Sequence, residues 1–266
     1  MIHLRAIDYC PTTESIEFPF NLPLVKNWAK IKLNQPVTFL VGENGSGKST
    51  LLETIACTVG SITIGSESVK TDPTLKEIQA LAKYMKVTWN QRTQRGFFLR
   101  AEDFFGYVKQ AAQTRAELKQ DLKRVDQENV HRSRFAQGQA RMAYARELND
   151  IQNRYGDGLD THSHGESYLE LFQGRFVPGG LYLLDEPEAA LSPLRQLGFL
   201  SLLKEVVAQD AQLIIATHSP ILMAFPGAEI LSCDQAPLQK VQWEDLEHVT
   251  LTRDILNNPD QYIRHL

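Results

Sequence analysis

The chain has 266 residues, of which 42% are hydrophobic and 23% are charged, and its formal net charge is −4. These values are ordinary for a globular protein, no apolar run approaches the roughly 20 residues that span a bilayer, and the first ten residues lack the apolar core of a secretory signal. Three separated cysteines argue against a disulfide framework or a thiolate zinc site, so we expect a cytoplasmic protein without membrane insertion, with a single domain over residues 1–266.

The first third of the chain alternates short apolar stretches with turn residues. Strands are predicted over residues 3–7, 15–20 and 30–33, partly exposed, and over residues 36–41, which read PVTFLV and are fully apolar apart from one threonine. Glycines follow, and then KSTLLETIACTV at residues 48–59 shows helical periodicity. The order is strand, loop, helix, preceded by an antiparallel β part.

The middle of the chain is helical and basic. Residues 96–108 predict a strand running into a helix, and a helical insertion is expected at about 104–155. From Lys83 to Arg154 there are 15 Lys and Arg against 8 Asp and Glu, a local charge of +7. Such asymmetry indicates either a separate partner for this segment, with nucleic acid as the candidate, or a solvated helical face.

The last third returns to alternating strands and helices. Residues 179–187, 211–220 and 228–234 contain almost wholly apolar strands, and residues 191–209 form an amphipathic helix with a proline near its start. This alternation predicts an α/β fold with a mostly parallel central sheet.

GENGSGKST at residues 42–50 satisfies the spacing of a phosphate-binding loop in its required context, after a buried strand and before a helix. Backbone N–H groups of such a loop cradle phosphates, the lysine reaches the β- and γ-phosphates, and the serine hydroxyl can hold Mg²⁺. The predicted nucleotide-binding residues are Gly42, Glu43, Asn44, Gly45, Ser46, Gly47, Lys48, Ser49 and Thr50.

Two later strands end in polar residues. Asp185 and Glu186 follow a buried strand, where Asp185 is predicted to hold Mg²⁺ and Glu186 to polarise the attacking water. His218 ends the next buried strand and is predicted to contact the γ-phosphate. Lys48, Glu186 and His218 are therefore the candidate catalytic residues.

GENGSGKST, LYLLDEPEAALSP and ATHSP, in this order, resemble the motifs of ABC-type P-loop ATPases, in particular the stand-alone RecF- and SMC-like proteins. The resemblance covers the chain apart from the helical insertion. It implies an ABC-type ATPase head that uses ATP and Mg²⁺ and sandwiches two nucleotides between two copies of the chain.

The stretch SHGES at residues 163–167 occupies the place of the family's signature motif. The resemblance implies that Ser163, Gly165 and Glu166 contact a nucleotide held by the other copy, although His164 stands where the family has a glycine. Two other interpretations remain open: a helix cap, and a metal site formed by Asp160, His162 and His164.

Two further positions depart from the family pattern. No glutamine matches the family's Q-loop, and FFLRAEDFF at residues 97–105 occupies its place with Arg100 and Glu102. Glu102 is the predicted substitute and Gln91 the second choice, and the alternative is that these charges simply face the surface. Ser192 stands where the family's D-loop has an aspartate.

We therefore predict an ATPase that forms a homodimer on binding ATP and couples this engagement to an unidentified partner protein or to nucleic acid through residues 83–154. The alternatives are the energising subunit of a membrane transporter and a nucleotide-switched regulator of a toxin or nuclease.

Overall fold

Two β-sheets form the framework of the protein in a computed structural model, which describes residues 1–11, 16–64, 68–129, 131, 133, 135, 137–142, 144–146 and 164–264. The central sheet has the strand order β5-β6-β7-β3-β8-β9, and its five strands from β5 to β8 run parallel. The last strand, β9, runs antiparallel to β8. The mostly parallel α/β fold is confirmed.

The parallel strands are short and buried. They are β3 (Val37–Val41), β5 (Phe98–Arg100), β6 (Leu181–Asp185), β7 (Gln212–Ala216) and β8 (Glu229–Ser232), and β9 spans Gln239–Val241. Every residue of β3, β6 and β7 is buried, as expected for strands that are covered on both faces. Their carboxyl ends therefore meet along one edge of the sheet, where ligands bind in open α/β sheets.

A second, antiparallel sheet has the order β2-β1-β4, with β1 at Leu4–Tyr9, β2 at Ile31–Lys32 and β4 at Met85–Trp89. The antiparallel N-terminal part is confirmed, but its third strand comes from a later segment that was not predicted. The strand predicted at residues 15–20 is wrong, because residues 17–20 form bends and turns instead. Pro19 has no N–H to donate to a strand ladder, and its carbonyl accepts the Leu22 amide in a turn.

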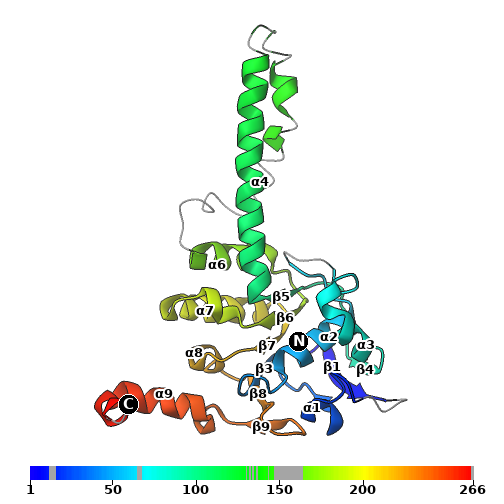
Figure 1. The fold of residues 1–266 in the computed structure, drawn as a ribbon, viewed down its shortest axis with the longest axis vertical. Helices are drawn as coiled ribbons and strands as arrows, with labels where there is room; N and C mark the ends of the chain where they lie inside the picture. Colours follow the sequence, from blue (N-terminus) through cyan, green and yellow to red (C-terminus); the bar gives the residue numbers. More distant parts are fainter. Residues whose placement is uncertain are drawn as a thin grey trace.

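Helices cover both faces of the central sheet (Figure 1). On one face α6 (His164–Arg175) and α7 (Pro193–Ala208) pack against Val37, Phe39 and Val41, whereas Leu40 faces α2 (Lys48–Val59) and the antiparallel sheet. Alternate β3 side chains thus enter two separate cores. The shorter elements are α1 (Pro23–Lys26), η1 (Pro73–Leu75), α3 (Lys76–Ala82), η2 (Pro187–Ala190), α8 (Pro220–Met223), η3 (Trp243–Asp245), α9 (Glu247–Asn257) and α10 (Pro259–Ile263).

The helical insertion projects from the body as an arm (Figure 1). Its main helix, α4, spans Ala101–Glu128 and begins directly after β5. Residues 137–142 and 144–146 are also helical, and Arg141 forms an ion pair of 3.2 Å with Asp126 of α4. The predicted helical insertion is confirmed in its described part, but it starts slightly earlier than residue 104. Within the described ranges, no helix is both long and apolar enough to cross a membrane.

Candidate functional site

Glycines shape the loop between β3 and α2. Gly45 and Gly47 have φ of 84° and 98°, in the left-handed region that is strained for residues with a side chain. At Gly42, where φ is 143°, an added Cβ would come within 2.7 Å of Asp234 Oδ1. The backbone can therefore curl closely in front of the N-terminus of α2, an arrangement that suits the binding of phosphate groups.

Lys48 is folded over this loop. It is 5% exposed, and its ammonium Nζ donates to the carbonyl oxygens of Gly42 at 2.7 Å and Glu43 at 2.9 Å. The hydroxyl of Ser46 is buried and has no hydrogen-bond partner within the described residues. A buried ammonium beside a buried donor without an acceptor fits an anionic ligand rich in oxygen, such as the phosphates of a nucleotide.

The acidic end of β6 lies next to the start of α2. Ser49 Oγ donates to Asp185 Oδ1 at 3.2 Å, and Asp185 is 8% exposed. Burial raises the pKa of the Asp185 carboxyl to about 7, and the charges of Glu186 and Glu53 act in the same direction. A hydroxyl beside a buried carboxylate provides the kind of oxygen ligands that suit Mg²⁺.

Glu186 has an unusual backbone conformation at this edge, with φ of 48° and ψ of 50°. A left-handed conformation costs a residue with a side chain roughly 1–2 kcal/mol. Here the Glu186 amide donates to the Ala216 carbonyl of β7 at 2.9 Å, which holds the strained turn at the strand end. Glu186 Oε1 lies 3.9 Å from His218 Nε2, so the two candidate catalytic side chains are neighbours.

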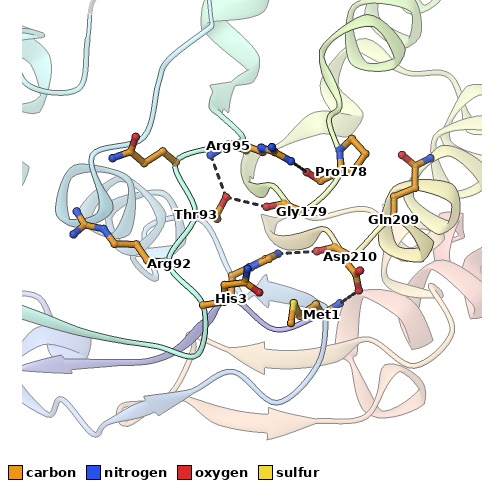
Figure 2. Close-up of a pocket in the computed structure, with 11 residues that line it drawn as sticks. Met1, His3, Arg92, Thr93, Arg95, Pro178, Gly179, Gln209 and Asp210 are labelled. Atoms are coloured by element: carbon orange, nitrogen blue, oxygen red, sulfur yellow. Dashed lines mark hydrogen bonds and ion pairs between the residues drawn. The ribbon is translucent and has the colours of Figure 1, made fainter.

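A cavity of about 300 Å³ opens beside these residues. Its lining includes Ser49, Asp185 and Glu186, and also Glu102 from the first turn of α4. Gln91, the other predicted substitute for the Q-loop glutamine, lines a different cavity of about 710 Å³ (Figure 2). That cavity is lined by Gly179 and Asp210, which precede β6 and β7. It therefore lies at the amino ends of the parallel strands, opposite the edge that carries Asp185 and Glu186.

A protein-family model described as an AAA domain matches residues 16–163, more than half of the chain. The chain belongs to the AAA-domain family. A second model, described as "AAA domain, putative AbiEii toxin, Type IV TA system", matches residues 172–224 of this AAA domain.

More distant similarities extend over most of the AAA domain. The cobalt import ATP-binding protein CbiO of Salmonella paratyphi A is 24% identical over 241 residues, which cover 82% of this chain and 78% of CbiO. An Smc head domain from Pyrococcus furiosus aligns with a TM-score of 0.48 and 13% identity over 96% of this chain and 100% of that one. The structure of cbiO1 from Clostridium perfringens aligns with a TM-score of 0.45 and 15% identity, over 90% of this chain and 91% of cbiO1. At these levels the similarities identify neither a substrate nor a partner.

Arg100, at the junction of β5 and α4, sits among four carboxylates of the AAA domain. Its guanidinium forms hydrogen bonds with Asp103 at 2.7 Å and Asp72 at 3.1 Å, and ion pairs of 3.5 Å with Glu53 and Glu102. The side chains of Arg100, Glu53, Asp72 and Asp103 are between 7% and 17% exposed. The positive charge of Arg100 is therefore neutralised by carboxylates inside the protein. Through its contacts with Glu53 and Asp103, Arg100 joins α2 to the base of the arm.

We expect Arg100→Met to lower the free energy of unfolding by about 3–5 kcal/mol, because it leaves buried carboxylates without a counter-charge. Denaturant titration followed by circular dichroism measures this loss. Arg92→Met, at an exposed arginine with no ion pair in the described structure, should change the same quantity by about 0.5 kcal/mol or less. Protonation removes the unpaired charges, so the loss at Arg100 should narrow as the pH falls. Equal losses for the two variants would contradict this account.

Two residues near the phosphate loop were not predicted from the sequence. Asp234, just after β8, accepts a hydrogen bond from the Glu43 amide at 2.6 Å and so fixes the loop from the side. Burial lowers the pKa of His248 in α9, whose buried Nε2 has no hydrogen-bond partner in the described residues. The charges of His218 and Lys48 lower this pKa further, whereas those of Asp234 and Glu43 raise it. Neither position carries a motif signal.

The proposed signature segment is only partly described. Ser163 lies outside the described residues, as do Asp160 and His162 of the alternative metal site. Helix α6 begins at His164, so Gly165 and Glu166 belong to its first turn. Elsewhere in the described residues, no cluster of three or more His, Cys, Asp or Glu side chains could hold a metal ion.

Proposed function

We propose that this AAA domain binds ATP with Mg²⁺ and hydrolyses it. The observation that carries the proposal is the contact of 3.2 Å between Ser49 and Asp185, directly behind a glycine loop that holds Lys48. Ser49 and Asp185 would hold the magnesium ion, which when bound withdraws charge from the phosphate oxygens. Lys48 would bind the β- and γ-phosphates.

Glu186 would act on the attacking water. Its side chain is 46% exposed and lines the cavity next to Asp185, so a water molecule has access to its carboxylate. As a general base it would orient the water and draw its proton as the oxygen attacks the γ-phosphorus. His218, 3.9 Å from Glu186, would hydrogen-bond the γ-phosphate. Glu102 shares the cavity and is the better substitute for the missing Q-loop glutamine.

Lys48→Ala tests the proposal. Loss of the ammonium removes charge-assisted hydrogen bonds to phosphate, worth about 3 kcal/mol together, so ATP affinity should fall roughly 100-fold. Titration with a fluorescent ATP analogue measures the affinity, and phosphate release measures turnover. Lys204→Ala, an exposed position on α7, should leave both unchanged. A wild-type protein that binds no ATP at millimolar MgATP would contradict the proposal.

The proposed working form is a homodimer with two sandwiched nucleotides. Ser163, Gly165 and Glu166 of one copy would contact the γ-phosphate held by the other, since the amides of a first helical turn attract anions. ATP would then stabilise the closed dimer, and hydrolysis would release it.

The arm is the proposed output element. Nucleic-acid binding along residues 83–154 has less support than the local charge of +7 implies. Arg100 is enclosed by carboxylates, and Arg124 and Arg141 form ion pairs with Asp121 and Asp126. A protein partner that responds to the arm is therefore favoured, and the toxin–antitoxin designation of the second family match agrees with such a partner.

A transporter-energising subunit is the second candidate, and the similarity to CbiO favours it. The long helix α4 of the arm does not favour a transporter subunit, because the resemblance to ABC-type ATPases implies a compact helical subdomain at this place in transporter subunits. Co-purification with a membrane-spanning partner separates the two candidates.

A further inference from the structure

Glu188 connects the ends of two neighbouring strands of the central sheet. It lies in η2, directly after β6, and its Oε1 accepts a hydrogen bond of 2.6 Å from the backbone N–H of His218, just after β7. The neighbouring Thr217 side chain lowers the pKa of this carboxylate, against the larger effect of burial. The turn that carries His218 is therefore held by a side chain from the strand end that carries Asp185 and Glu186.

The Glu188 carboxylate does not line the cavity of about 300 Å³ beside Asp185 and Glu186. The residues that line this cavity are Ser49, Glu53, Arg100, Ala101, Glu102, Asp185 and Glu186. Burial raises the pKa of Glu188, and its Oε2 is buried without a hydrogen-bond partner in the described residues. The bond of 2.6 Å to the His218 amide is therefore the contact through which Glu188 can affect the candidate site.

Helix α6 adjoins η2, the turn that contains Glu188. Its Tyr168 is 1% exposed. The negative charges of Glu188 and Asp185 act on the Tyr168 phenol, whose pKa burial raises well above its usual value. The helix that begins at the proposed signature segment is thus in contact with the turn that fixes His218.

We propose that Glu188 is a positioning residue, which holds His218 at the γ-phosphate through its backbone amide and ties that position to helix α6. The proposal rests on the proposed ATP hydrolysis. Movement of α6 on engagement with a second copy would then be transmitted through η2 to His218. Glu188 itself touches neither the nucleotide nor the attacking water.

The test compares Glu188→Ala with Glu188→Gln in steady-state ATP hydrolysis. Glu188→Ala removes the acceptor, so kcat should fall at least roughly tenfold while KM changes by less than about threefold. Glu188→Gln keeps an amide oxygen that can accept the His218 N–H, so its kcat should stay within about twofold of wild type. If Glu188→Ala does not fold, Glu188→Met takes its place. Glu205→Ala, at an exposed glutamate of α7, is the matched control.

A double-mutant cycle with His218→Ala separates positioning from a general structural role. If Glu188 acts through His218, then Glu188→Ala in the His218→Ala background should lower kcat by less than about twofold. An equal loss in both backgrounds overturns the proposal, as does a Glu188→Gln variant as slow as Glu188→Ala, or a Glu188→Ala variant as fast as wild type. Failure of the proposed function looks different: the wild type and Lys48→Ala would then be equally inactive.

Discussion

The Glu186→Gln variant should elute as a dimer in the presence of ATP and Mg²⁺ and as a monomer without nucleotide. Glu186 is the exposed carboxylate at the acidic strand end, held in a left-handed turn beside Asp185. Its replacement leaves the Ser49–Asp185 pair and Lys48 in place, so ATP still binds. General-base catalysis contributes about 100-fold or more to the rate, and its loss should trap the nucleotide before hydrolysis.

The trapped dimer follows from linkage. Nucleotide that contacts both copies adds interface free energy that exists only in the closed state, so blocking its hydrolysis shifts the population toward the dimer. Size-exclusion chromatography with light scattering measures the mass, and phosphate release confirms the block. Glu205→Gln, on the exposed side of α7, should behave as wild type. A Glu186→Gln protein that stays monomeric at micromolar concentration with ATP and Mg²⁺ would contradict the sandwich dimer.

Ser163→Arg should leave ATP binding by the monomer intact and abolish both dimerisation and turnover. The residue precedes α6, which begins at His164, and in the proposed sandwich dimer its hydroxyl would contact a nucleotide held by the other copy. A bulky cation there would block the approach of the second copy. The phosphate loop of the same chain would remain complete, because it lies between β3 and α2.

If Ser163 acts on a nucleotide held by the other copy, the variant should keep its affinity for ATP and lose its turnover. Affinity for a fluorescent ATP analogue should match wild type within about twofold, while phosphate release should fall to the background rate. In the combined Glu186→Gln and Ser163→Arg protein, the ATP-dependent dimer should disappear. Ser201→Arg, at an exposed position of α7, is the control for added charge. Normal turnover by Ser163→Arg would show that this segment does not act in trans.

Local patterns predicted the parts of the fold that depend on local physics. The helix at residues 48–59 has the predicted bounds, because its periodicity and flanking glycines specify it. The almost wholly apolar strands were also correctly placed, since near-continuous apolar runs are typical of parallel strands that are covered on both faces. The strand expected at residues 15–20 failed because Pro19 lacks the donor that a ladder needs. The strand β4 was missed, because it is defined by pairing with β1 far away in the sequence.

The sequence by itself determined the family, the phosphate loop, and the positions of Asp185, Glu186 and His218 at the ends of two buried strands. These features are contiguous motifs, so their chemistry depends on spacing along the chain. Only the tertiary structure decided which distant side chains meet them. It placed Glu102 in the cavity and Gln91 at the opposite edge, and it brought Asp234 to the Glu43 amide and Glu188 to the His218 amide. Parallel strands bring their carboxyl ends to one edge whatever their separation in sequence, and no local pattern encodes which residues then become neighbours.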